Sequence, residues 1–246
     1  MWSIDKEKLG RIGRVAAAAG VHCYTGAGAV CALVALAAAD QGNLRWAMWA
    51  VIAANLIDST DGYIARRVGV GRILPRIDGA RLDGVVDFTT SALTPVYLMY
   101  KFGSFPRPSL VWISVILVGS AIRYSRSLNP WRGEGFHRGL PVAWNYLLFY
   151  VLYVPLGSLV IAALILILTA LNFVPWGFVH TRQHARFRFI GVVLLVLWWL
   201  CLAVVSQNLN AGGSVWVYVS LLFPVGYIII SSLSFVNRSP VHDGAK

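Results

Sequence analysis

Residues 58–66 read DSTDGYIAR, residues 67–78 read RVGVGRILPRID, and residues 79–87 read GARLDGVVD. Half of the chain's ten acidic residues lie in this stretch, which long apolar runs flank on both sides. At or near a bilayer, each unpaired charge costs roughly 2.5–3.5 kcal/mol. Four carboxylates together therefore cost about 10 kcal/mol on that scale. The stretch therefore requires cations that neutralise these carboxylates, and it is the candidate functional site of the chain.

The acidic residues of the stretch recur at helical spacing. Asp58 and Asp61 stand three residues apart. Gly79, Asp83 and Asp87 repeat every four residues. Residues three or four apart share one face of a helix. The sequence therefore predicts two helices whose acidic faces can meet.

The composition indicates an integral membrane protein. Hydrophobic residues make up 58% of the chain and charged residues only 13%, which is unlike an ordinary soluble domain. Apolar runs of the length that spans a bilayer predict about eight transmembrane helices, and hence an all-α polytopic fold, over residues 15–38, 46–66, 80–100, 109–127, 141–154, 156–174, 187–206 and 214–236. If residues 155–157 form a kink instead of a turn, the count is seven.

The chain is expected to form one domain. Apolar and basic residues alternate over residues 1–14, which predicts a short amphipathic helix at the membrane surface. Residues 15–236 form the predicted transmembrane catalytic domain, and residues 237–246 form a cytoplasmic tail.

The basic residues indicate topology. The net charge is +11, and the chain holds 21 Lys and Arg residues. If the chain has eight spans and a cytoplasmic N-terminus, 18 of these residues face the cytoplasm and three face the opposite side: Arg45, Lys101 and Arg107. This positive-inside bias puts the acidic stretch at the cytoplasmic end of the second and third spans. Topology and anionic lipid headgroups explain the positive charge, so a nucleic-acid partner is not required.

The residue types of the stretch indicate metal-assisted chemistry on a phosphate. Carboxylates without His or Cys at ligand spacing suit Mg²⁺ or Mn²⁺, and two such ions can clamp a phosphoryl group. Gly62, Ala65 and Gly79 allow a ligand to approach the backbone closely. Arg66 offers a planar fork to phosphate oxygens. Together these residues predict a nucleotide-diphosphate site.

Simpler interpretations apply to some charged residues. The aspartates can instead form an ion-pair network, without metal, with Arg66, Arg67, Arg76 and Arg81. That network does not account for the small residues at these spacings. Asp78 lies off the repeating face, and we expect it to cap the N-terminus of the following helix.

These residues resemble the CDP-alcohol phosphotransferase family, whose signature is two acids, Gly, Ala and Arg on one helix, then Gly and two acids on the next. The family's usual spacer between the two helices is shorter than residues 67–78. The longer spacer is similar to that of the bacterial phosphatidylcholine synthase branch. Residues 21–26, VHCYTG, and residues 139–145, GLPVAWN, also resemble that branch.

The resemblance implies transfer of the phosphatidyl group from CDP-diacylglycerol to free choline, giving phosphatidylcholine and CMP. It makes Asp58, Asp61, Asp83 and Asp87 the ligands of two Mg²⁺ or Mn²⁺ ions, with Asp87 as the general base. It also implies that the cytidine diphosphate is held by Gly62, Ala65, Arg66 and Gly79. A homodimer in the bacterial inner membrane, with a site open to the cytoplasm, is implied as well.

Two further sets of residues are assigned to the substrates. Aromatic faces usually hold quaternary ammonium groups, and we expect the choline contacts among Tyr24, Glu134, Trp144 and Tyr150. We expect lipid phosphate to contact Arg123 and Arg126, which otherwise act as topology determinants.

Two rival functions remain open. Another acceptor, such as inositol, serine or glycerol phosphate, would keep the same chemistry. A transporter or cation channel would also place acids within the membrane, but it requires carboxylates along several spans, and here they are confined to two adjacent helix ends.

Overall fold

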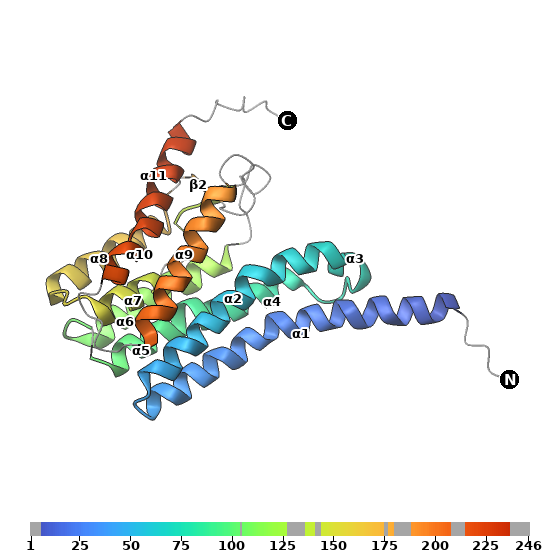
Figure 1. The fold of residues 1–246 in the computed structure, drawn as a ribbon, viewed down its shortest axis with the longest axis horizontal. Coiled ribbons are helices and arrows are strands. Elements are labelled where there is room, and N and C mark those ends of the chain that lie inside the picture. Colours follow the sequence, from blue (N-terminus) through green and yellow to red (C-terminus); the bar gives the residue numbers. More distant parts are fainter. Residues whose placement is uncertain are drawn as a thin grey trace. The chain divides into compact units, whose positions relative to one another are not determined.

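The computed structural model describes residues 6–103, 105–126, 136–140, 144–174, 177–179, 188–207 and 215–236. The chain forms two compact units, Met1–Ser104 and Phe105–Lys246 (Figure 1). Both units are built almost entirely of helices. The acidic stretch lies wholly within the first unit.

The first unit begins with a hairpin of two long helices. Its elements are α1 (Lys6–Asp40), α2 (Leu44–Val68), α3 (Val70–Ile73), α4 (Gly79–Phe88), the π-helical turn η1 (Thr89–Leu93) and α5 (Thr94–Lys101). The hairpin turns at Gly42, whose φ of 71° favours glycine. The Asn43 side chain then caps α2 by accepting a hydrogen bond from the Trp46 backbone N–H, 3.2 Å away. Helix α2 ends at Gly69, which adopts a left-handed conformation.

Helix α4, turn η1 and helix α5 follow one another without an interruption, over the range predicted for the third span. The π-helical turn directly precedes Pro95, which supplies no backbone N–H to a helix. Wider turns of this kind are one way in which a helix accommodates such a disruption. The Thr94 hydroxyl donates to the Thr89 carbonyl, 2.8 Å away, and so bridges the turn.

Small residues on α1 let the other helices of the first unit approach it closely. A Cβ added to Gly28 would lie 2.7 Å from Cγ1 of the buried Val86 on α4. Close backbone approach at small residues is typical of helix packing in membranes. The connection between α2 and α4 also packs on α1, because Val70 of α3 is buried against Ala18 and Val21.

An ion-pair cluster ties the C-terminal end of α1 to α5. Lys101 Nζ lies 3.1 Å from Asp40 Oδ1, and the Tyr97 hydroxyl donates to the same carboxylate oxygen. Because Asp40 immediately precedes the turn into α2, this cluster lies at the opposite end of α2 from the acidic stretch.

The second unit packs around aromatic side chains. Its elements are α6 (Ser109–Ser125), β1 (Phe136–Arg138), α7 (Trp144–Tyr153), α8 (Ser158–Leu171), β2 (Gly177–Val179), α9 (Arg188–Gln207), α10 (Val215–Ser220) and α11 (Leu222–Val236). The Trp198 ring of α9 lies 4.5 Å from that of Tyr146, and 6.1–6.2 Å from those of Phe223 and Phe149, between ring centroids. Strands β1 and β2 pair in antiparallel register, an element that the all-α prediction did not include.

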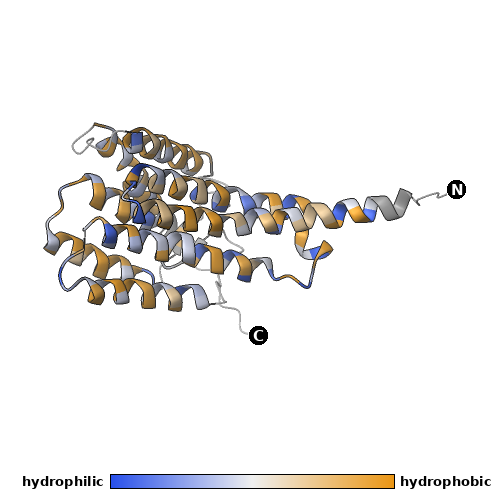
Figure 2. Cartoon of the chain, turned by 90° about the horizontal axis from the view of Figure 1, so that it is seen from below, coloured by the Kyte–Doolittle hydropathy of each residue, from blue (hydrophilic) through white to orange (hydrophobic). Residues whose placement is uncertain are grey.

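Each of the eight predicted apolar ranges is helical over most of its described part. Apolar residues cover most of the helices (Figure 2). Among the described residues, three helices are long and apolar enough to cross a membrane, over Gly10–Asp40, Phe189–Gln207 and Val215–Leu233. The protein is therefore a helical membrane protein, and the count of eight spans stays a prediction.

Two local predictions can be compared with the structure. Residues 154–157 are not helical, so α7 and α8 are separate helices instead of one kinked helix. The range 1–14 of the predicted interfacial helix overlaps α1, which runs from Lys6 into the first apolar range without a break. Its place at the membrane surface stays a prediction.

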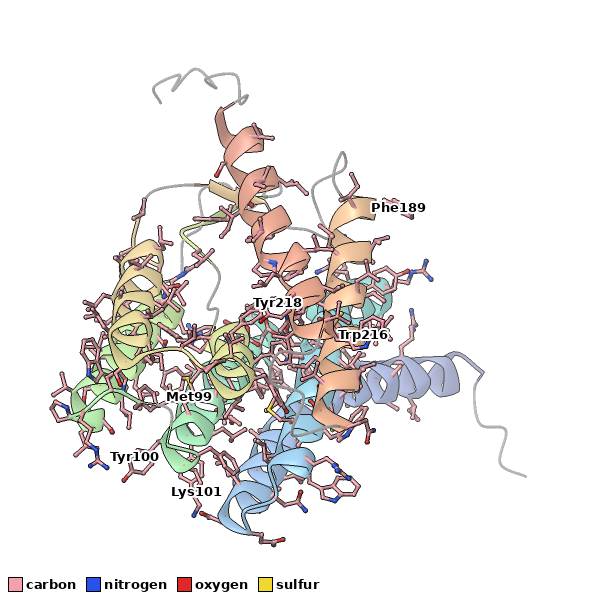
Figure 3. The ribbon with its side chains drawn as sticks, turned by 60° about the vertical axis from the view of Figure 1, so that its left-hand side comes forward. Met99, Tyr100, Lys101, Phe189, Trp216 and Tyr218 are labelled. Carbon is pink, nitrogen blue, oxygen red and sulfur yellow. The ribbon has the colours of Figure 1, made fainter. Side chains whose placement is uncertain are left out.

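Apolar and aromatic side chains project from several helices. Phe189 on α9 is 81% exposed, and Tyr100 near the end of α5 is 52% exposed; both point away from their helices (Figure 3). Met99, the neighbour of Tyr100, is fully buried. Outward apolar side chains on long helices are what a lipid environment requires.

Gly139 is expected to be the glycine least tolerant of substitution. Its φ is 78°, and an added Cβ would collide with the backbone carbonyl oxygen of Asn172. Gly139→Ala should therefore lower the stability of the second unit by the roughly 1–3 kcal/mol that a strained backbone conformation costs, or by more because of the collision. Thermal unfolding of the detergent-solubilised protein measures this effect.

Gly157→Ala is the matched control, since its φ is −68° and nothing lies within 4 Å of an added Cβ. An equal melting temperature for Gly139→Ala and Gly157→Ala would contradict the account of Gly139.

Candidate functional site

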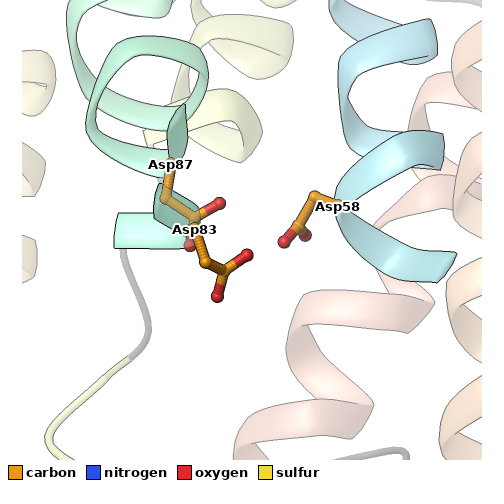
Figure 4. A group of neighbouring side chains, drawn as sticks. All are labelled: Asp58, Asp83 and Asp87. Carbon is orange, nitrogen blue, oxygen red and sulfur yellow. The ribbon is translucent and has the colours of Figure 1, made fainter. Parts of the chain in front are cut away.

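Helices α2 and α4 bring three of the four predicted metal ligands together. Asp58 lies in the second half of α2, and Asp83 and Asp87 lie one turn apart on α4. One carboxylate oxygen from each residue lies within 4.8 Å of the other two. Figure 4 shows the Asp58 side chain pointing from α2 toward the two side chains on α4. The structure thus places two acidic helical faces opposite each other.

The chemistry of this carboxylate cluster fits a hard divalent cation. All three ligand atoms are oxygens, and all three residues are half-buried. Mg²⁺ and Mn²⁺ prefer carboxylate oxygen over imidazole or thiolate ligands. At an effective dielectric constant of 20, two like charges at this separation repel by about 3–4 kcal/mol. A bound cation would relieve that repulsion.

Asp61 lies near these residues but outside the group of three. It is buried, with only 5% of its surface exposed. Its Oδ1 atom accepts a hydrogen bond from the backbone N–H of Gly62. The structure therefore engages one Asp61 oxygen with its own helix, and the role of Asp61 as a metal ligand stays a prediction.

Gly62 and Arg66, two residues assigned to the cytidine diphosphate, lie against each other. A Cβ added to Gly62 would lie 3.3 Å from Nη1 of Arg66. The absence of a side chain at position 62 leaves room for the guanidinium to fold back along α2. Arg66 is exposed and Ala65 is half-buried. This end of α2 thus combines a cation with small residues, one turn beyond the carboxylates.

Gly79 begins α4, and the residue before it caps that helix. The Asp78 side chain accepts hydrogen bonds from the backbone N–H groups of Ala80 and Arg81, at 3.1 and 3.2 Å. The prediction that Asp78 is an N-cap is confirmed. Arg81 also pairs with Asp78 at 3.1 Å. One of the arginines in the alternative ion-pair network therefore binds an acid outside the carboxylate cluster.

Helix α1 adds residues to the site that the two-helix motif does not contain. The Tyr24 hydroxyl lies 2.7 Å from the Thr60 hydroxyl, and Thr60 stands between Asp58 and Asp61 on α2. His22 Cε1 would lie 3.4 Å from a Cβ added to Gly79. His22 belongs to the stretch 21–26 that resembles the family branch, and its contact with Gly79 was not predicted.

Two of the residues predicted to bind choline belong to the second unit. Trp144 is fully buried, and its indole N–H donates to the Ser120 hydroxyl, 2.8 Å away. Tyr150 is half-buried, with its hydroxyl 3.1 Å from that of Ser220. Tyr24, by contrast, belongs to the first unit and is 36% exposed. Glu134 lies outside the described residues. The choline contacts stay a prediction.

The two arginines predicted to contact lipid phosphate lie at the end of α6. Arg126 is exposed, and its guanidinium carbon lies 4.7 Å from the centre of the Phe173 ring. Arg123 is half-buried, and its Nε atom is buried with no hydrogen-bond partner among the described residues. This orphaned donor is compatible with an anionic ligand.

The chain was compared with known proteins. No protein-family model matches it. It is 32% identical to the phosphatidylcholine synthase of Rhizobium meliloti (strain 1021), over 85% of this chain and 89% of that protein. The synthase of Brucella melitensis is 30% identical, over 82% and 72% of the two chains. That of Pseudomonas aeruginosa is 31% identical, over 73% and 75%.

These similarities extend over most of the chain and of each relative, and they agree with the resemblance seen in the acidic stretch. The protein is therefore an enzyme of phospholipid biosynthesis, and the chain belongs to the phosphatidylcholine synthase family.

Proposed function

We propose that the protein transfers the phosphatidyl group of CDP-diacylglycerol to free choline, giving phosphatidylcholine and CMP. The observation that carries this proposal is the carboxylate cluster of Asp58, Asp83 and Asp87, in a chain related to enzymes named phosphatidylcholine synthase. The chemistry requires a hydroxyl nucleophile, a base and charge neutralisation, and no covalent protein intermediate.

In this proposal, Asp58, Asp61, Asp83 and Asp87 hold two Mg²⁺ or Mn²⁺ ions. When bound, such ions neutralise charge on the phosphate oxygens during an in-line displacement. For Asp61, this role requires the carboxylate oxygen that does not accept the Gly62 N–H, or a rotation of the side chain.

Asp87 is the proposed general base. Its carboxylate takes the proton from the choline hydroxyl. The hydroxyl oxygen then forms a bond to the phosphorus that carries the diacylglycerol, and the bond from that phosphorus to the oxygen of CMP breaks. The membership of Asp87 in the carboxylate cluster supports this role, because the proposed metal ions would hold the phosphate at the same cluster.

Small residues and one arginine at the ends of α2 and α4 are proposed to hold the cytidine diphosphate. Gly62, Ala65 and Gly79 contribute no bulky side chain, and the exposed guanidinium of Arg66 can donate two parallel hydrogen bonds to phosphate oxygens. The folded-back position of Arg66 places this donor beside Gly62, the residue that follows Asp61 on α2.

The remaining contacts are proposed from chemistry. The choline ammonium is held by aromatic faces, with Tyr24, Trp144, Tyr150 and Glu134 as the proposed residues. The lipid phosphate contacts Arg123 and Arg126, of which Arg123 has the orphaned donor. The proposed site faces the cytoplasm, as the distribution of basic residues indicates. The proposed homodimer in the bacterial inner membrane follows from the family resemblance.

Asp83→Asn removes one charge from the carboxylate cluster while keeping the shape of the side chain. We expect CMP release to fall by more than the roughly 10–100-fold that loss of a residue supporting a metal ligand costs. The yield of folded protein from membranes should stay the same. Asp40→Asn, which removes a carboxylate at the other end of α2, is the control and should keep full activity. Full activity in Asp83→Asn would refute its assignment as a ligand.

The acceptor is tested with a panel of labelled alcohols. Membranes that contain the protein are incubated with CDP-diacylglycerol, Mn²⁺ and choline, serine, inositol or glycerol phosphate. We expect CMP release and a labelled phospholipid with choline alone. Only choline among these acceptors carries the quaternary ammonium group that aromatic faces recognise.

Product formed with serine or inositol but not with choline would overturn the proposed acceptor. No product with any alcohol would overturn the proposed transferase and favour a transporter.

A further inference from the structure

The imidazole of His22 is a buried polar group next to the proposed nucleotide site. Its Nε2 atom is shielded from solvent and has no hydrogen-bond partner among the residues that the structure describes. A buried nitrogen without a partner costs free energy, and such groups in folded proteins usually have a structural or functional explanation. The residue as a whole is half-buried.

The imidazole ring of His22, on α1, lies against the face of α4 that carries Asp83 and Asp87. Its Cε1 and Nδ1 atoms would lie 3.4 and 4.0 Å from a Cβ added to Gly79, so the missing side chain at position 79 provides part of the space for the imidazole. Gly79, Asp83 and Asp87 repeat every four residues and share one face of α4. His22 therefore borders the site one helical turn before Asp83.

A second contact fixes this part of α1 beside the site. Tyr24 is two residues from His22, and its hydroxyl lies 2.7 Å from that of Thr60, between Asp58 and Asp61 on α2. Helix α1 thus contacts α4 through His22 and α2 through Tyr24. Of these two α1 residues, His22 is the one with a buried nitrogen that has no hydrogen-bond partner among the described residues.

We propose that His22 binds the cytidine diphosphate group of the lipid substrate through Nε2, an inference that rests on the proposed function. The quaternary ammonium of choline carries no N–H and offers nothing to this nitrogen, and the acyl chains are apolar. The cytosine ring and the diphosphate both carry hydrogen-bonding groups. In this proposal, the ring rotates about the Cβ–Cγ bond so that Nε2 leaves its covered position and reaches the ligand.

This role makes His22 a residue for nucleotide affinity, and it can be tested without turnover. In the detergent-solubilised protein with Mn²⁺, CDP should raise the melting temperature of the wild type. His22→Ala should require about tenfold more CDP for the same shift, which corresponds to the loss of one hydrogen bond. His22→Gln, which keeps a polar group at a similar reach, should recover most of the affinity. Cys23→Ala, at the exposed neighbouring position, is the control and should match the wild type.

Steady-state kinetics supply a second readout. We expect His22→Ala to raise the KM for CDP-diacylglycerol about tenfold while the KM for choline stays the same. A substitution that affects only the fold would lower kcat or the yield of protein. It would not raise the KM for CDP-diacylglycerol relative to the KM for choline.

The outcomes separate this proposal from the function on which it rests. If CDP stabilises the wild type and His22→Ala equally, the role of His22 is wrong and the nucleotide site stands. If CDP does not stabilise the wild type at any concentration, both the nucleotide site and the role of His22 are overturned. If His22→Ala lowers CDP affinity in a protein that does not use choline, the role of His22 stands and the acceptor is wrong.

Discussion

The repulsion among Asp58, Asp83 and Asp87 is the constraint on which the account of this protein depends. Their oxygens lie within 4.8 Å of one another in a chain whose other long segments are apolar. With all three carboxylates ionised and no cation bound, three like-charged pairs at this separation would oppose the packing of α2 against α4 by about 10 kcal/mol in total, for an effective dielectric constant of 20. That is comparable to the whole stability of a typical domain. Divalent cations held by the cluster would convert this repulsion into a link between the two helices, and such cations are suited to phosphoryl transfer.

The packing of α1 explains how the two acidic helices are held at this distance. Gly28 admits Val86 of α4, and Val70 of α3 packs on Ala18 and Val21. The connection between α2 and α4, which is longer than the family's usual spacer, is thus partly folded against α1. His22 continues this interface to Gly79 at the start of α4, and Tyr24 continues it to Thr60 on α2. One long helix therefore positions both the motif and its connection.

Sequence patterns predicted the features that depend on local chemistry. Apolar runs located the helices, because a membrane helix must be apolar over its length. Helical spacing placed Asp58, Asp83 and Asp87 on faces that meet, and the N-cap role of Asp78 follows from its position before α4. The spacing did not predict the hydrogen bond of Asp61 to Gly62, because a shared helical face does not fix a side-chain rotamer. The contact of His22 with Gly79 was not predicted, because it joins helices distant in sequence. Strands of three residues, such as β1, are too short to show a periodicity.

Direct measurement of metal binding tests the central claim without reliance on any substrate. Manganese binding to the detergent-solubilised protein can be followed by electron paramagnetic resonance, because free Mn²⁺ gives a signal that bound ions lose. We expect the wild type to bind two Mn²⁺ ions per chain, and we expect Mg²⁺ to compete for the same sites. Binding should be lost when Asp58, Asp83 and Asp87 are all replaced by Asn. Absence of binding in the folded wild type, or unchanged binding in the triple variant, would contradict the central claim.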